Sequence, residues 1–314
     1  MYRIGIDLGG TNVAFGLTQE DGTLIRKSSV PTKRELSADD LAAFMAQTVL
    51  AWLREIGIDE SEILSIGMGC PGACDAQNGI LLKTTNLPFR NTNIREIFGR
   101  YTKIPLYLGN DADCAALGEV TCGHAKGYRN SITVTLGTGV GGGVILDGKI
   151  YSGFNGGGGE LGHMVIRTGG EPCNCGRHGC FEAYASATAV IRDTVRAAKA
   201  HPESAIVRLC GGDLSRIDAK TAFDAMREGD PVGTEIVQRF IENLGEGIIN
   251  FINIFQPEII LIGGGISKEG EFLLKPLREY VYRYAYGADF LPRTKIEKAQ
   301  LGNDAGIIGA AMLG

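Results

Sequence analysis

Two glycine-containing stretches of the chain match each other in pattern. IDLGGTNVAFGL spans residues 6–17, and VTLGTGVGGGVI spans residues 134–145, about 128 positions later. Each stretch predicts a strand, a turn built from glycine and threonine, and a second strand. A glycine-turned hairpin that recurs at this interval indicates a duplicated domain, and no low-complexity linker separates the two copies.

The segments around the hairpins carry both strand and helix signals. Apolar runs predict buried strands at 63–70, 104–109 and 258–265. Apolar residues at helical spacing predict helices at 38–56, 111–122, 186–200, 219–228, 231–254 and 304–313. The chain is therefore expected to be an α/β protein, and its hairpins disfavour a plain Rossmann arrangement.

The bulk composition limits the classes of partner. Hydrophobic residues make up 44% and charged residues 21%, which is typical of a chain that buries a core. The net charge of -5 argues against nucleic acid, because binding to phosphates needs clustered Lys and Arg. No apolar run of about 18 residues predicts a membrane span. The N-terminus, MYRIGIDLGG, does not resemble a signal peptide, so we expect a cytoplasmic protein.

Both glycine turns have a structural and a functional interpretation. Such a turn can simply close a hairpin. Glycine also lets backbone N–H groups point at phosphate oxygens, and threonine hydroxyls add donors. Neither turn is a P-loop, because each leads into a strand and lacks the lysine of that motif. A third cluster, LIGGG at 261–265, is equally compatible with a turn and with a site for a nucleotide base or ribose.

Asp7 distinguishes the first turn from the second, where Thr135 has the equivalent place. A carboxylate beside a phosphate site is repelled unless a cation lies between them. Asp7 is therefore a candidate for Mg²⁺, through water molecules, since Mg²⁺ loses its own waters reluctantly. The candidate residues for binding a nucleotide and Mg²⁺ are Asp7, Gly9, Gly10, Thr11, Asn12, Gly137, Thr138, Gly139, Gly141, Gly264 and Gly265.

The motifs DLGGTN, LGTGVGGG, GELGH, CNCGRHGC and IGGG occur in this order. Together they resemble the ROK family of sugar kinases, and the resemblance covers essentially the whole chain. It implies the two-domain actin-like (ribonuclease H-like) ATPase fold of the sugar kinase, heat-shock protein 70 and actin superfamily. The expected smaller domain is 1–110 with the C-terminal helix 303–314, and the larger is 111–302. The winged-helix DNA-binding region of the family's repressors is not expected, because strand signals begin at residue 2.

Asp111 follows a predicted strand in YLGNDADCAALGE and begins a predicted helix. It could cap that helix, or it could be the base that takes a proton from a sugar hydroxyl. The resemblance implies the second role, because Asn110 and Asp111 match the family pattern E-N-D-x-N. Gly109 and Asp113 depart from that pattern, which puts the local polarity and the sugar preference in doubt.

The resemblance also implies a set of residues that hold the hydroxyls of a hexose. Carboxylates and amides suit vicinal hydroxyls, although any one of them could equally be a solvated surface group. The candidates are Gly72, Asn86, Asn110, Asp111, Glu160, His163 and Glu182.

CNCGRHGC places Cys173, Cys175 and Cys180 in one short loop. A chain of this kind does not suggest a disulfide scaffold, and the loop lacks a C-x-x-C redox pair, although free redox-active thiols remain an alternative. Three thiolates and one imidazole make a closed structural zinc site. His163 and His178 both compete for the fourth place, and the family resemblance favours His163. The other cysteines are interpreted as small buried hydrophobic residues: Cys70, Cys74, Cys114, Cys122 and Cys210.

Such a zinc ion would order the loop beside the sugar residues and take no part in the chemistry. The loop and the glycine turns belong to different elements of the predicted fold. Loss of zinc is therefore expected to lower the affinity for sugar and to leave nucleotide binding intact.

Within the family, the chain is most similar to bacterial ATP-dependent glucokinases. The resemblance implies phosphorylation of a hexose at oxygen 6, with glucose favoured and Asp111 as the base. N-acetylmannosamine, allose and fructose are alternative substrates, and a non-catalytic sugar sensor is the alternative from another class. Relatives are commonly dimers, so a homodimer is expected.

Overall fold

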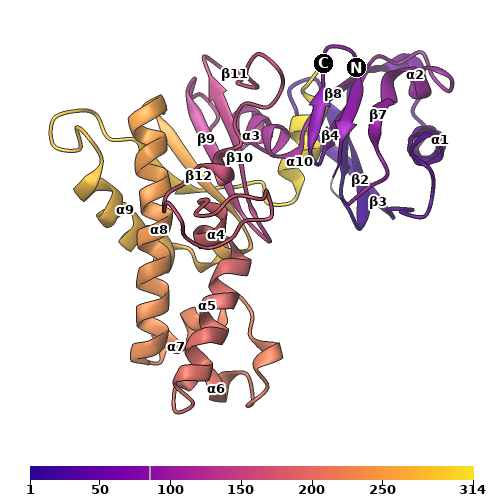
Figure 1. Cartoon of the computed structure of the whole chain (residues 1–314). Coiled ribbons are helices and arrows are strands. Elements are labelled where there is room, and N and C mark those ends of the chain that lie inside the picture. Colours follow the sequence, from indigo (N-terminus) through magenta and orange to yellow (C-terminus); the bar gives the residue numbers. More distant parts are fainter. Residues whose placement is uncertain (85) are drawn as a thin grey trace. The chain divides into compact units, whose positions relative to one another are not determined.

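The computed structural model describes residues 1–84 and 86–314 (Figure 1). Its internal contacts divide the chain into two compact units. Unit 1 contains residues 1–133, 143–159 and 299–314, and unit 2 contains residues 134–142 and 160–298. The boundary passes through strands β9 (Ser131–Leu136) and β10 (Val140–Leu146), which form the second predicted hairpin.

Unit 1 is built on a five-stranded sheet with the order β3-β2-β1-β4-β8. β1 and β2 form the first predicted hairpin, with Ile6 opposite Phe15, and β3 extends it in antiparallel fashion. β4 pairs in parallel with β1, and β8 in parallel with β4. The carboxyl ends of β1, β4 and β8 therefore meet at one edge of the sheet. The strands are β1 (Tyr2–Leu8), β2 (Asn12–Gln19), β3 (Leu24–Pro31), β4 (Ile63–Cys70) and β8 (Leu106–Asn110).

Helix α1 (Ala38–Ile56) covers part of the core of unit 1. Ser37 begins it by accepting a hydrogen bond from the backbone N–H of Asp40, and Gly57 ends it with a φ of 76°. Its buried stripe includes Trp52, whose ring meets Phe15 of β2 edge-on at 5.0 Å between centroids. The helical period of the sequence is thus explained by burial of one face.

The C-terminal helix α10 (Asp304–Ala311) packs against β1 and β4 of the N-terminal sheet (Figure 1). Gly5 and Gly67 permit this approach, because a Cβ at either position would collide with backbone atoms of α10. Helix α3 (Asp111–Cys122) packs on α10 equally closely, with Gly118 against the backbone of Ala305. These contacts place both helices in unit 1.

A three-stranded antiparallel sheet, β5-β6-β7, adjoins the end of β4. Arg95 fixes it to the main sheet: its guanidinium donates to the carbonyl oxygens of Gln77, Ala76 and Leu106 at 2.7, 3.0 and 3.0 Å. The elements of this region are η1 (Glu60–Glu62), β5 (Ala73–Asp75), β6 (Ile80–Lys83), β7 (Arg90–Asn93) and α2 (Ile94–Gly99).

The second five-stranded sheet has the order β11-β10-β9-β12-β13. The long helix α8 (Pro231–Phe255) begins at Asp230, which accepts a hydrogen bond from the N–H of Gly233 at 2.8 Å. Its apolar face receives Phe181, whose ring meets Phe251 at 5.6 Å. The remaining elements are β11 (Lys149–Ile150), η2 (Leu161–His163), α4 (Glu182–Ala185), α5 (Ala187–Ala200), α6 (Ala205–Leu209), η3 (Leu214–Arg216), α7 (Thr221–Arg227), β12 (Ile259–Gly264), η4 (Gly265–Glu269), α9 (Glu271–Tyr284) and β13 (Lys295–Lys298).

The structure confirms the predicted α/β pattern, the two glycine-turned hairpins and the six helices to within two residues at each end. The division into units differs from the predicted boundary at 110/111, because α3 packs on α10 and so stays with the N-terminal sheet. The small sheet β5-β6-β7 and helix α9 were not among the elements expected from the sequence pattern. No helix within the described residues is long and apolar enough to cross a membrane.

Candidate functional site

The first glycine turn, residues 9–12, connects β1 to β2 in unit 1. Its own backbone closes it, because the N–H of Gly9 donates to the carbonyl oxygen of Asn12 at 3.0 Å. Thr32 holds two of its carbonyls: the hydroxyl donates to Gly9 and the backbone N–H to Thr11, both at 2.8 Å. A Cβ at Gly10 would meet nothing within 4 Å. The turn is thus anchored through its carbonyls and has open space at Gly10.

Asp7 lies near the end of β1, immediately before this turn. Burial, and then the negative charge of Asp111, raise the pKa of Asp7 to about 6. Gly306 of α10 lies so close that a Cβ there would come within 2.9 Å of the Asp7 carboxylate. A cation beside Asp7 would offset both causes of the raised pKa, so the residues present fit the predicted Mg²⁺.

Asn110 and Asp111 lie where β8 ends and α3 begins. Asn110 is the helix cap: its Oδ1 accepts from the N–H groups of Ala112 and Asp113 at 2.8 and 3.3 Å. Its Nδ2 donates to the carbonyl oxygen of Gly72 at 3.1 Å. Asp111 is the first residue of the helix, and its Oδ1 also accepts from Ala112, at 2.9 Å. Asn110 already accepts from both N–H groups at the start of the helix, so an aspartate at position 111 is not needed as the cap.

Gly72 and Asn86 lie between β4 and β8 in the chain. Gly72 has a φ of 101°, and a Cβ there would collide with the carbonyl oxygen of Lys83, so only glycine suits this turn. The Gly72 carbonyl oxygen accepts the hydrogen bond from Asn110, so these two residues lie side by side. Asn86 is exposed.

The two departures from the family pattern lie beside a cavity of about 580 Å³ in unit 1. Gly109 faces the C-terminal segment, because a Cβ would lie 3.1 Å from the Leu313 side chain. Asp113 is 8% exposed and lines the same cavity with Asn110 and residues 152–156. The absence of a side chain at 109 is thus matched by close packing of Leu313.

The second glycine turn, residues 137–140, connects β9 to β10 in unit 2. The N–H of Gly137 donates to the carbonyl oxygen of Gly139 at 3.0 Å. The hydroxyl of Thr188 donates to the carbonyl of Thr138 at 2.7 Å, and the N–H of Ala187 to that of Gly137 at 2.8 Å. Two carbonyls of this turn are thus held by the start of α5, as Thr32 holds two in the first turn.

Glu182 contacts this turn directly. Its Oε2 accepts a hydrogen bond from the N–H of Val140 at 3.0 Å. A Cβ on Gly139 would collide with the Glu182 carboxylate, although one on Gly137 would meet nothing within 4 Å. Packing against Glu182 therefore explains why position 139 is glycine. No contact among the described residues explains the glycine at position 137.

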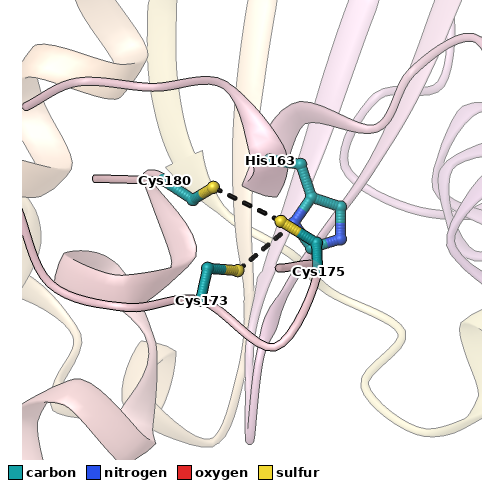
Figure 2. Close-up of side chains that lie close together, drawn as sticks. All are labelled: His163, Cys173, Cys175 and Cys180. Carbon is teal, nitrogen blue, oxygen red and sulfur yellow. Dashed lines mark hydrogen bonds between the residues drawn. The ribbon is translucent and has the colours of Figure 1, made fainter. Parts of the chain in front are cut away.

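His163, Cys173, Cys175 and Cys180 converge in unit 2 (Figure 2). Their ligand atoms all lie within 4.8 Å of one another. The Cys173 Sγ is 3.6 Å from His163 Nδ1, and the Cys175 Sγ is 3.6 Å from the Cys180 Sγ. Ligands of a tetrahedral zinc with bonds of about 2.0–2.3 Å lie about 3.3–3.8 Å apart, so these two separations and the Cys₃His chemistry fit this ion.

The thiols of this cluster are in unequal surroundings. Burial raises the pKa of Cys173 to about 12 and also raises the pKa of Cys180. The backbone N–H of Arg177 lowers the pKa of the exposed Cys175. His178 pairs with Pro172 in a short β-bridge and is outside the group of converging ligand atoms.

Three further candidates are placed as follows. Glu160 is exposed and precedes η2. Gly264 has a φ of 80°, and a Cβ there would collide with the backbone of Leu136, so the fold itself requires this glycine. Gly265 has open space around its Cα.

The two threonines that hold the turns were not found by sequence analysis. Thr32 follows β3, and Thr188 lies in the first turn of α5. A hydroxyl that donates to a backbone carbonyl distant in sequence leaves no local pattern, and the two threonines have different spacings from their turns.

The two five-stranded sheets, the two glycine-turned hairpins and Asp111 at a strand-to-helix junction agree with the fold that the sequence motifs imply. The model of the ROK family matches residues 3–314, and the chain belongs to that family. The glucokinase of Thermotoga maritima is 39% identical over 311 residues, which cover 99% of this chain and 96% of that protein.

Solved structures confirm the fold. The ROK family glucokinase from Streptomyces griseus, in complex with glucose and AMPPNP, has a TM-score of 0.81 and 32% identity, covering 100% of this chain and 99% of that chain. The ROK hexokinase from Thermus thermophilus has a TM-score of 0.84 and 33% identity, and the match covers 100% of this chain and 97% of that chain. The chain is therefore a sugar kinase of the actin-like class.

Proposed function

We propose that this protein transfers the γ-phosphate of ATP to glucose and releases glucose 6-phosphate and ADP. The glucokinase relatives support this substrate pair. The observation that carries the proposal is the position of Asp111 at the edge of the sheet where β1, β4 and β8 end, with the capping role taken by Asn110.

In the proposed reaction, Asp111 accepts the proton of the sugar's 6-hydroxyl as that oxygen attacks the γ-phosphorus. The new bond joins O6 to phosphorus, and the bond from phosphorus to the bridging oxygen of ADP breaks. The backbone amides of Gly10, Thr11, Asn12, Thr138, Gly139 and Gly141 are proposed to hold phosphate oxygens, with Gly265 toward the nucleoside. The amides of Gly9, Gly137 and Val140 already donate within the protein and shape the turns. Mg²⁺ near Asp7 would neutralise charge on the phosphates.

The sugar hydroxyls are proposed to contact Gly72, Asn86, Asn110, Glu160, His163 and Glu182, as predicted from the sequence. Both lone pairs of the Asn110 Oδ1 are occupied by α3, and one proton of its Nδ2 by Gly72. Asn110 can therefore only donate to a sugar oxygen.

We also propose that the Cys₃His cluster binds one structural zinc ion. The donor set leaves no open position for a reacting water, so the metal would hold the loop and take no part in phosphoryl transfer. The Nδ1 of His163 faces the thiol of Cys173, so the Nε2 is the nitrogen left for a sugar hydroxyl.

The proposal is tested by measuring ADP release with a panel of glucose, N-acetylmannosamine, allose and fructose, with Asp111→Asn as control. Glucose should give the highest kcat/KM. A preference for another sugar would identify that sugar as the substrate. Sugar binding without ADP release would support the alternative of a non-catalytic sugar sensor. Homodimerisation, a cytoplasmic location and the absence of a nucleic-acid partner stay predictions.

A further inference from the structure

The second glycine turn is held from outside by one short segment, residues 182–188. Glu182 accepts from the N–H of Val140 at 3.0 Å, Ala187 donates to the carbonyl of Gly137 at 2.8 Å, and Thr188 donates to the carbonyl of Thr138 at 2.7 Å. All of these groups belong to unit 2.

The same segment is the direct continuation of the cysteine loop. Glu182 is two residues beyond Cys180, and its Oε1 lies 3.6 Å from the Cys173 Sγ. One carboxylate oxygen thus faces the metal-ligand cluster while the other holds the turn. Phe181 lies between Cys180 and Glu182 in the chain. It is fully buried, and its N–H donates to the carbonyl of Met164 at 2.7 Å.

Hydrogen bonds connect Glu182 to the segment that follows it. Ser186 caps α5 by accepting from the N–H of Ala189 at 3.1 Å, and the N–H of Ser186 donates to the carbonyl of Glu182 at 3.2 Å. The start of α5, which carries Thr188, is therefore fixed to Glu182 and through it to the loop.

The first glycine turn offers a comparison within the same chain. Thr32 donates to the carbonyl of Gly9 as Thr188 donates to that of Thr138. Thr32 comes from the end of β3 in unit 1, and no residue of the cysteine loop belongs to that unit. The two threonines make equivalent bonds, but only Thr188 is joined to the metal-ligand loop.

We propose that Glu182 and Thr188 are positioning residues that couple the Cys₃His cluster to the second glycine turn, so that loss of metal from the cluster weakens nucleotide binding. This rests on the proposed function, in which that turn binds nucleotide phosphates. It differs from the sequence-based expectation that zinc loss affects sugar binding alone.

The physical basis is the direction of the turn's amides. A carbonyl held back by a donor keeps the adjacent N–H turned the opposite way, where it can meet a phosphate oxygen. Residues 174–178 of the cysteine loop are exposed, so without metal this part of the loop has little buried surface to order it. Glu182 then loses its fixed position, and the turn loses the bond at Val140.

The first experiment compares Thr188→Val, Thr188→Ser and Thr32→Val. Valine keeps the β-branched shape and removes the donor. We expect Thr188→Val to weaken ADP binding, measured by calorimetry, about five- to tenfold, the worth of one hydrogen bond, with glucose affinity and zinc content unchanged. Thr188→Ser should restore ADP affinity. Thr32→Val should show a similar loss. Unchanged ADP affinity in Thr188→Val would overturn the role of Thr188.

The second experiment removes the metal in different backgrounds. Cys175→Ser, at an exposed ligand, should lose zinc and weaken ADP binding by about five- to tenfold. In Glu182→Ala the bond at Val140 is already lost, so adding Cys175→Ser should cause a smaller further loss of ADP affinity, transmitted only through the backbone of residue 182 and the start of α5. In Thr32→Val, the same addition should cause the full loss, because the first turn is not linked to the loop.

Three results would overturn the coupling to the metal: equal ADP affinity in wild type and folded Cys175→Ser, a full further loss in the Glu182→Ala background, or a wild-type protein without zinc. If Cys175→Ser does not fold, the ADP affinity of Glu182→Ala decides, since the proposal requires it to fall with zinc retained. Failure of the proposed function would appear differently, as wild-type protein that binds no ADP.

Discussion

The side-chain amide of Asn110 donates a hydrogen bond to the carbonyl oxygen of Gly72 over 3.1 Å. This bond joins the chain leaving β4 to the junction between β8 and α3. The Oδ1 of Asn110 meanwhile caps α3, so one side chain orients both the turn and the helix start. Asp111, the next residue, is thereby fixed at the edge of the sheet where the proposed chemistry takes place.

Asp111→Asn keeps the shape of this side chain and removes its capacity to accept a proton. Loss of a general base typically lowers the rate by about 10²–10⁴-fold. We expect kcat for glucose phosphorylation to fall within this range, while the dissociation constant for glucose changes far less. Near wild-type turnover in Asp111→Asn would mean that another group is the base.

Gly137→Ala and Gly139→Ala separate two reasons for glycine in the second turn. A Cβ at Gly137 meets nothing in the protein, so this variant should keep its thermal stability and raise the KM for ATP about ten- to hundredfold through interference with phosphate hydrogen bonds. Gly139→Ala should displace Glu182 and impair both ATP and glucose binding. An unchanged KM for ATP in Gly137→Ala would place the phosphates elsewhere.

Asp7→Asn should stabilise the protein while it lowers activity. The folded-state pKa of Asp7 is raised from 3.8 to about 6, so ionising it costs folding free energy that accumulates as the pH rises from about 4 to 6 and then stays constant. The cost reaches at most about 3 kcal/mol. Urea unfolding at pH 7.5 should therefore show a higher free energy of unfolding for Asp7→Asn, with a smaller difference at pH 5.

The control for Asp7 is Asp111→Asn, which removes the nearby negative charge. It should lower the pKa of Asp7 and reduce the same penalty in part, because burial remains the larger cause. If Asp7→Asn is less stable than wild type at pH 7.5, the Asp7 carboxylate is stabilised by groups other than those that raise its pKa.

Elemental analysis should find about one zinc per chain in the purified protein. Cys175→Ser and His163→Ala should lose it, whereas His178→Ala should retain it, because the His178 ring is outside the converging ligand atoms. Retention of zinc by His163→Ala together with its loss from His178→Ala would reverse the ligand assignment. Full kinase activity in a zinc-free protein would contradict the structural role.

The sequence by itself determined much of the fold and the site inventory. The repeated hairpins, the helical stripe over 38–56 and the order of the glycine motifs are local patterns, because β-turns and amphipathic helices depend on residues a few positions apart. The three cysteines were recognised for the same reason, since they lie within eight consecutive residues. The choice of His163 over His178 came from the family resemblance, and the ligand geometry agrees with it.

Only the tertiary structure decided the relationships between distant segments. Asp7 acquires its raised pKa from burial and from Asp111, more than a hundred residues away. The placement of α3 with the N-terminal sheet follows from its packing on α10, the last helix of the chain. Thr32, Glu182 and Thr188 hold the glycine turns through hydrogen bonds to backbone groups, which are the same in every residue. No sequence pattern can specify such a partner, so its identity depends on how the folded chain brings the two segments together.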